Sequence, residues 1–321
     1  MNLKQFLNAK RQAGIIDTDL LDVVEAVADA TIKVAYQLRV AVLHGHVGAT
    51  EDTNVQGEVQ KPLDVIANNI FIESCQGSPA VSFAVSEELD DEIAVSPAGK
   101  FAVIFDPLDG SSNLDVNVTV GSIVSIIPAT AADQLLQPGR NQVFAAYAAY
   151  GPSTSLVLTF GDDVEFFSLN AYGEYELADS NVTIPLGNAE FSINTSRQQI
   201  WDKPVQDYIE GCLAGAGVYK KRYNMRWVGS MVADIHRIMH RGGIFLYPHD
   251  TEVAKKGGRL RLLYEANPMG FLVEAAGGLA STGKARILDL QPTELHQRVP
   301  VILGASDEVE AIEGFYSRAT A

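Results

Sequence analysis

Lys100-Phe-Ala-Val-Ile-Phe-Asp-Pro-Leu-Asp-Gly-Ser-Ser-Asn113 is the segment that most limits the folds open to this chain. Phe101–Phe105 is an apolar run without polar alternation, which is typical of a strand covered on both faces. Pro107 has no N–H to donate, so we expect the strand to end at Asp106 and the chain to turn there. Asp109-Gly110 suits a tight turn, and either of the two following serines suits the start of a helix.

Carboxylates gather at the end of this expected strand, and they are Glu87, Glu88, Asp106 and Asp109. Carboxylates at a turn bind hard divalent cations, and the N–H groups of Gly110, Ser111 and Ser112 can receive phosphate oxygens. A divalent metal beside a phosphate-binding site is typical of a metal-assisted phosphatase. An isolated Asp-Gly pair is most often an acidic surface turn. Here the apolar run, the Asp-Pro-x-Asp spacing, the double serine and the nearby glutamate pair favour the catalytic interpretation.

The composition is that of a globular protein. The 321 residues are enough for two packed units, and the apolar content of 47% with a mean hydropathy of +0.05 is ordinary. No apolar stretch approaches the roughly 20 residues that span a bilayer, so we expect no membrane partner. A formal net charge of −16 argues against nucleic-acid binding. Two cysteines, Cys75 and Cys212, fit a reducing compartment, and Met1–Arg11 has no signal-peptide pattern, so we expect a cytoplasmic location.

The N-terminal part predicts helices followed by strands. Apolar residues recur at helical spacing from about Thr18 to Leu43, with Asp17 or Thr18 as the cap. Ala49–Gln60 is polar and contains glycine, which predicts a mobile loop, and a short helix follows from Asp64 through Glu73. Apolar, β-rich runs predict strands at 81–85, 101–105, 122–127, 143–150, 155–160, 164–168 and 174–177.

A second series of strands and helices begins after Pro185–Asn188. Its apolar runs predict strands at 190–193, 243–247, 260–264 and 299–303, the last strand of the fold. Its helical patterns cover 201–213, 230–240 and 267–276. The sequence therefore predicts an α/β fold with two halves, residues 1–187 and 188–321, that share one cleft.

Asp106-Pro-Leu-Asp-Gly-Ser-Ser112 resembles the signature of the metal-dependent, lithium-sensitive sugar and inositol phosphatases. Other stretches narrow the resemblance to class I fructose-1,6-bisphosphatases, and they are Ser86–Glu88, Leu135–Asn141, Val228–His236, Gly242–Pro248, Leu260–Met269 and Leu295–Gly304. The resemblance extends from about the first helix to the last strand. It implies a layered α-β-α-β-α fold with mixed sheets.

The same resemblance implies a set of metal ligands and catalytic groups. It implies two or more Mg²⁺ ions per subunit, replaceable by Mn²⁺, held by Glu87, Asp106, the Leu108 carbonyl, Asp109 and Glu265. Glu88 and Asp64, together with Glu87, would activate the nucleophilic water. Glu265 follows the expected strand 260–264, so it has the same local design as Asp106: a carboxylate directly after an apolar strand.

For the sugar bisphosphate, the resemblance assigns Asp109, Gly110, Ser111, Ser112, Asn194, Arg226, Tyr247 and Arg259. Arg259 replaces the family's usual Lys, and Trp227 replaces a Tyr that binds substrate. Arg197 replaces another phosphate-facing Tyr and could compensate with a bidentate contact. Glu58 replaces an Asp that reaches the metals, and its extra methylene would weaken that reach. Arg226 matches an arginine lent to a neighbouring subunit, which implies a homo-oligomer, a tetramer by resemblance.

The resemblance also bears on inhibition by AMP. Responsive relatives bind the AMP phosphate at a Gly-Thr-Gly-Glu-like turn before the first long helix. Here that turn is Gly14-Ile-Ile-Asp-Thr18, with branched side chains where small ones would let backbone N–H groups approach. The chain keeps Lys100, but it has Phe101 where a Tyr is usual and Pro128 where an Arg is expected. We therefore expect weak or no inhibition by AMP.

The resemblance implies an enzyme that removes the 1-phosphate of fructose 1,6-bisphosphate to give fructose 6-phosphate, in gluconeogenesis or the Calvin cycle. A sedoheptulose-1,7-bisphosphatase, alone or as a second activity, is the alternative, because Arg197, Trp227 and Arg259 lie where the distal phosphate would be held. A non-catalytic regulator that binds sugar phosphates is an alternative of a different class. The complete set of carboxylates argues against it, since a binding protein does not need them.

Overall fold

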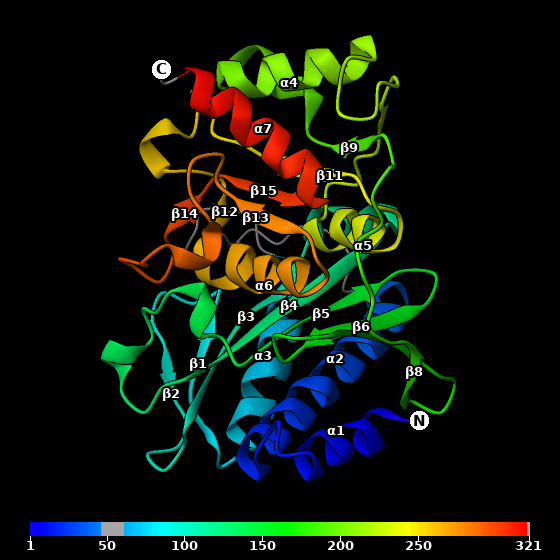
Figure 1. Ribbon diagram of the computed structural model, residues 1–321. Coiled ribbons are helices and arrows are strands. Elements are labelled where there is room, and N and C mark those ends of the chain that lie inside the picture. Colours follow the sequence, from blue (N-terminus) through cyan, green and yellow to red (C-terminus); the bar gives the residue numbers. More distant parts are fainter. Residues whose placement is uncertain (46–60, 320–321) are drawn as a thin grey trace.

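The computed structural model describes residues 1–45 and 61–319. Layers of helices alternate with layers of sheet, in the order helix, sheet, helix, sheet, helix (Figure 1). This arrangement confirms the predicted layered α/β fold. The loop expected at 49–60, including Glu58, lies outside the described residues. No helix in the described part of the chain is long and apolar enough to cross a membrane.

An eight-stranded sheet forms the core of the N-terminal half, in the order β2-β1-β3-β4-β5-β6-β7-β8. Its strands are β1 (Val81–Ser86), β2 (Ile93–Ala94), β3 (Phe101–Asp109), β4 (Val120–Pro128), β5 (Phe144–Tyr150), β6 (Thr154–Thr159), β7 (Val164–Leu169) and β8 (Tyr175–Asp179). Neighbouring strands are antiparallel, except that β1 and β3 are parallel. That one parallel pair brings the carboxyl ends of β1 and β3 to the same edge.

Three helices cover one face of this sheet: α1 (Leu3–Gln12), α2 (Thr18–His44) and α3 (Pro62–Gln76). Asp17 caps α2, because its carboxylate accepts the Leu20 N–H at 2.8 Å, and Gly45 ends the helix with a φ of 70°. Phe71 of α3 stacks on Phe105 of β3 with ring centroids 5.0 Å apart. Phe101, Val103 and Phe105 of β3 thus pack against the helices, as the two-residue period of a strand requires.

The C-terminal half contains a five-stranded sheet in the order β10-β9-β11-β15-β13 and a small β12-β14 pair. The strands are β9 (Glu190–Ser192), β10 (Asn224–Met225), β11 (Ile244–Tyr247), β12 (Leu260–Arg261), β13 (Leu279–Ser281), β14 (Arg298–Val299) and β15 (Val301–Gly304). Helices α5 (Met231–Arg241) and α6 (Asn267–Ala275) lie between the two large sheets, whereas α4 (Lys203–Ala214) and α7 (Ser306–Ala319) cover the outer face (Figure 1). The proposed division at residue 187 falls between β8 and β9 and stays a prediction.

Short helical turns join these elements, and they are η1 (Ser111–Val116), η2 (Ala132–Gln134), η3 (Gly139–Asn141), η4 (Thr195–Ile200), η5 (Ala254–Lys256), η6 (Leu262–Ala266) and η7 (Ile287–Asp289). All are 3₁₀ turns except η6, which is a π-helical turn. π-helical turns are rare and often occur at functional sites.

The expectation that the strand stops at Asp106 is wrong. Strand β3 continues to Asp109, but its pairing with β4 shifts between Asp106 and Asp109. Pro107 is tolerated there because a bulge does not need its missing N–H, and its carbonyl accepts a hydrogen bond from Ser122 Oγ at 2.7 Å. The turn comes at Gly110 instead, which has a φ of 74°.

Two strands expected in the C-terminal half are also wrong in part. The apolar run 260–264 is a strand only at Leu260–Arg261, and η6 follows it. A short apolar run without alternation is equally compatible with a buried helical turn, so its pattern could not distinguish the two. The run 299–303 is divided by Pro300 into β14, which pairs with β12, and β15, which pairs with β11 and β13. β15 is the last strand of the fold, as predicted, and helix α7 follows it.

Candidate active site

Two carboxylates lie together because β1 and β3 are parallel and in register. Ser86 is the neighbour of Phe105 across the two strands, and the Glu87 N–H donates to the Phe105 carbonyl at 3.1 Å. The residues that follow these two positions, Glu87 and Asp106, therefore emerge at the same edge of the sheet. Both side chains are buried.

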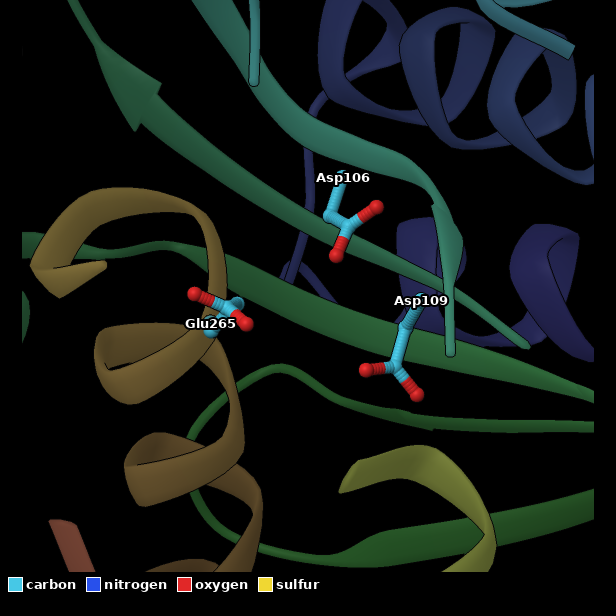
Figure 2. Close-up of side chains that lie close together, drawn as sticks. All are labelled: Asp106, Asp109 and Glu265. Carbon is cyan, nitrogen blue, oxygen red and sulfur yellow. The ribbon is translucent and has the colours of Figure 1, made fainter. Parts of the chain in front are cut away.

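A third carboxylate reaches this edge from the other half of the chain. The π-helical turn η6 carries Glu265, whose side chain faces Asp106 and Asp109 of β3 (Figure 2). One ligand atom from each of these three residues lies within 4.8 Å of the others. The Arg261 N–H donates to Glu265 Oε2 at 2.5 Å and so orients the carboxylate from the residue that precedes the turn.

Asp109 is held by the first turn of α5. Its carboxylate accepts hydrogen bonds from Ser230 Oγ at 2.5 Å, from the Met231 N–H at 3.2 Å and from the Val232 N–H at 2.9 Å. The positive end of the α5 dipole adds to this stabilisation. Gly110 permits the close approach, because a Cβ there would lie 2.5 Å from the Cβ of Ser230. This contact joins the two halves of the chain at the site.

The electrostatics of this cluster favour a cation. Burial, followed by the negative charges of Glu87, Asp109 and Glu265, raises the pKa of Asp106 well above its ordinary value. Burial also raises the pKa of Asp109, although its hydrogen bonds act in the opposite direction. Arg261 supplies positive charge through an ion pair with Glu87. Buried oxygen ligands that repel one another in this way fit hard divalent ions such as Mg²⁺.

Asp64 and Glu88 lie beside the cluster. Burial raises the pKa of Asp64 to about 6, a hydrogen bond from the Lys61 backbone lowers it, and the charge of Glu88 raises it again. The Lys61 N–H to Asp64 Oδ2 distance is 2.8 Å. Glu88 is half-buried, and its N–H donates to Ser86 Oγ at 3.2 Å. The charge of Glu88 therefore acts on Asp64.

A cavity of about 270 Å³ opens above these residues. Its walls include the predicted residues Glu87, Glu88, Asp106, Leu108, Asp109, Gly110, Ser111, Ser112, Trp227, Tyr247 and Glu265. The Trp227 ring lies parallel to Phe245 at 6.1 Å and edge-on to Tyr247 at 5.7 Å. One end of the cavity is thus anionic, and the other is aromatic.

Other predicted substrate residues do not line the cavity. Asn194 instead caps η4, where its Oδ1 accepts from Ser196 N at 3.2 Å and Ser196 Oγ at 2.7 Å. Arg226 is exposed, with its Nε 3.8 Å from Glu190. Burial raises the pKa of Tyr247, and the charges of Arg259 and Arg197, which lie outside the cavity walls, lower it.

The sequence did not single out Arg261 and Ser230, although both contact the carboxylates directly. Arg261 interrupts an apolar run, and a charge in a buried run is a signal for a charged partner. Ser230 stands where a helix cap is expected, and its hydroxyl serves both the Ala233 N–H at 3.2 Å and Asp109. The partners themselves depend on the tertiary fold and have no sequence signal.

Buried carboxylates beside a cavity of about 270 Å³, between two halves of an α-β-α-β-α fold, are the arrangement of a metal-assisted phosphatase. Sequence similarity to known families identifies the family. Residues 2–180 match the model of the fructose-1,6-bisphosphatase N-terminal domain, and residues 184–317 match that of the C-terminal domain. The chain belongs to the fructose-1,6-bisphosphatase family.

Relatives match along almost the whole chain. A class 1 fructose-1,6-bisphosphatase of Acinetobacter baumannii (strain AYE) is 47% identical over 322 residues, which cover 98% of this chain and 99% of the relative. One from Polynucleobacter necessarius subsp. necessarius (strain STIR1) is 45% identical, with 99% and 96% covered. The crystal structure of Leishmania major fructose-1,6-bisphosphatase in holo form aligns with a TM-score of 0.93 at 35% identity, and 99% of each chain is covered.

Proposed function

We propose that this chain is a Mg²⁺-dependent fructose-1,6-bisphosphatase that releases the 1-phosphate and leaves fructose 6-phosphate. The observation that carries the proposal is the meeting of Asp106, Asp109 and Glu265 from distant parts of the chain, within 4.8 Å, at one end of a sugar-sized cavity. Family membership supplies the substrate. Relatives named class 1 fructose-1,6-bisphosphatase are 45–47% identical to this chain over nearly their full length.

Glu87, Asp106, Asp109, Glu265 and the Leu108 carbonyl would hold the metal ions. When bound, such ions neutralise phosphate charge and lower the pKa of a water. The carboxylates must be ionised to hold a cation, so the raised pKa of Asp106 makes binding compete with protonation. Arg261 forms an ion pair with Glu87, so one positive charge already offsets part of the negative charge of the cluster before any cation binds.

Glu88 and Asp64 would accept the proton of the attacking water. The pKa of Asp64, raised to about 6 by burial, places it close to neutral pH, where a general base works best. The backbone N–H groups of Gly110, Ser111 and Ser112, at the start of η1, would receive oxygens of the departing phosphate. Tyr247 and Trp227 line the opposite end, where the sugar and its distal phosphate would lie.

Arg226 would act on a neighbouring subunit. It is exposed and does not line the cavity of its own chain, which supports a role across an interface in a homo-oligomer, a tetramer by resemblance. A cytoplasmic location is proposed from the two cysteines and the N-terminal sequence, and a place in gluconeogenesis or the Calvin cycle is proposed from the resemblance.

Parallel phosphate-release assays test the function. We expect the highest kcat/KM with fructose 1,6-bisphosphate and much lower values with inositol monophosphate, which has no distal phosphate to bind. A higher value with sedoheptulose 1,7-bisphosphate would favour the alternative enzyme, because Arg197, Trp227 and Arg259 depart from the family pattern at the distal phosphate. Absence of phosphate release from all three in Mg²⁺ would contradict the proposal.

A further inference from the structure

Arg197 and Arg259 meet at a single carboxylate oxygen. The Nη2 atom of Arg197 lies 2.7 Å from Glu252 Oε2, and the Nη2 atom of Arg259 lies 3.4 Å from the same oxygen. Two guanidinium groups repel each other unless an anion lies between them. Glu252 therefore occupies the position that an external anion would take.

Arg197 and Glu252 differ in how firmly they are held. Arg197 Nε donates to Asp250 Oδ2 at 2.7 Å, and the Arg197 side chain is only 14% exposed. Asp250 is 1% exposed, and its Oδ1 accepts the N–H groups of Glu252 at 2.9 Å and Val253 at 3.1 Å. The Glu252 side chain is 62% exposed. Arg197 is thus fixed, whereas the Glu252 carboxylate can leave at low cost.

Arg259 also retains capacity to bind. The Nε atom of Arg259 is buried and donates no hydrogen bond to any described residue. Arg259 directly precedes Leu260 and Arg261, which line the cavity of the candidate active site, and both guanidinium charges act on Tyr247 in the same cavity. The paired arginines and the aromatic end of the cavity therefore belong to one region.

We propose that Glu252 is an internal anion that occupies the distal-phosphate position between Arg197 and Arg259 and is displaced when the substrate binds. The proposal rests on the proposed function for the identity of the ligand. A phosphate group carries close to two negative charges and three acceptor oxygens, so it competes well with one carboxylate. Displacement of Glu252 reduces the affinity for the distal phosphate, so Glu252 sets KM and specificity and takes no part in bond cleavage.

Calorimetric titration with fructose 6-phosphate in Mg²⁺ tests this role, because that ligand carries the distal phosphate alone. Glu252→Gln removes the competing charge and should tighten binding about two- to fivefold, the range expected when one exposed ion pair is removed. Asp289→Asn is the matched control. Asp289 Oδ1 also accepts hydrogen bonds from two arginines, from Arg140 Nη1 at 3.1 Å and from Arg286 Nη1 at 3.2 Å, but it lies outside the cavity. The affinity of Asp289→Asn for fructose 6-phosphate should equal that of the wild type.

Unchanged or weaker binding by Glu252→Gln would overturn the proposal. A double-mutant cycle then separates displacement from simple loss of charge: in the Arg197→Ala background, Glu252→Gln should have a smaller effect, since one of its two partners is gone. Asp250→Asn should act with the opposite sign and weaken binding, because it releases Arg197. Equal effects of Glu252→Gln in both backgrounds would also contradict displacement.

Hydrolysis of fructose 1,6-bisphosphate by the wild type is measured separately. Failure of the proposed function can therefore be distinguished from failure of the proposal that Glu252 is displaced. Lack of phosphate release from fructose 1,6-bisphosphate would contradict the proposed function, and titration with inorganic phosphate would still report on the arginine pair. Tighter phosphate binding by Glu252→Gln would then support the internal anion, and unchanged binding would overturn it.

Discussion

Arg261 forms an ion pair with Glu87 inside the carboxylate cluster, and both side chains are nearly inaccessible, at 9% and 6% exposure. Arg261 precedes the π-helical turn that carries Glu265, and Glu87 follows the strand next to Asp106. One buried arginine thus connects the metal-ligand candidates of both halves. Its single positive charge cannot offset the negative charges of Glu87, Asp106, Asp109 and Glu265 together, so the cluster favours the binding of cations.

Asp106→Asn should therefore affect activity and stability in opposite directions. The change removes a buried negative charge that is repelled by Glu87, Asp109 and Glu265, so the metal-free protein should be at least as stable as the wild type. Every kcal/mol of relieved repulsion would raise the melting temperature by about 2 °C. Thermal unfolding in EDTA and in Mg²⁺ measures this. Mg²⁺ should stabilise the wild type strongly and the variant weakly.

Asp133→Asn, the same substitution at an exposed position, is the control and should leave both curves unchanged. A metal-free Asp106→Asn protein that melts well below the wild type would mean that Asp106 stabilises the fold, against the present account.

Glu88→Gln should lower kcat and leave KM and metal affinity close to those of the wild type. The amide keeps the shape of the side chain but cannot accept a proton from the water, and loss of a general base costs about 10²–10⁴-fold in rate. Steady-state kinetics with saturating Mg²⁺ check this, with Asp90→Asn as the exposed control. A raised KM at wild-type kcat would instead assign Glu88 to substrate binding.

His236 should make the protein sensitive to acid. It lies among aromatic rings, with Tyr147 Oη 3.0 Å from its Nδ1, and burial together with the charge of His240 lowers its pKa from 6.5 to about 4. The unfolded chain binds a proton at higher pH than the folded one. Stability from this residue is therefore fully present above pH 6.5 and lost as the pH falls to about 4, by about 3 kcal/mol.

Urea unfolding from pH 7 to 4 measures that loss. His236→Gln keeps a polar side chain but cannot protonate, so its stability should fall less steeply over this range. Parallel curves for the variant and the wild type would show that another group causes the acid sensitivity.

AMP should inhibit weakly or not at all. At the start of α2, where responsive relatives bind the phosphate, the Asp17 carboxylate accepts the Leu20 N–H at 2.8 Å, and Lys100 is engaged by Asp19. An added phosphate would meet an acidic side chain and a lysine that is already paired. Titration of AMP at saturating Mg²⁺ checks this. Half-inhibition in the low micromolar range would show that the site still binds AMP.

Local patterns predicted much of this fold. The helical spacing after Asp17 indicated α2 and its cap, and the apolar runs indicated the central strands of the large sheet. Edge strands such as β2 and β10 have two residues each, too few for any periodicity to appear. The bulge at Pro107 and the π-helical turn at Leu262–Ala266 depend on packing against the other half of the chain.

The sequence likewise indicated only some of the residues and contacts of the candidate site. The carboxylates of β3 follow from a strand and its turn, and Glu265 was expected from the resemblance. The pairing of Arg197 with Asp250 and Glu252 joins residues more than fifty positions apart in the sequence. No pattern in the sequence indicates such a contact, because it arises only when η4 packs beside the segment after β11.

Phosphate release from fructose 1,6-bisphosphate before and after removal of Mg²⁺ tests the central claim most directly. The account predicts that the wild type releases phosphate in Mg²⁺, stops in EDTA and resumes in excess Mg²⁺, while Asp106→Asn and Glu265→Gln release almost none under any of these conditions. Release by the wild type that persists in EDTA, or release by either variant at close to the wild-type rate, would contradict it.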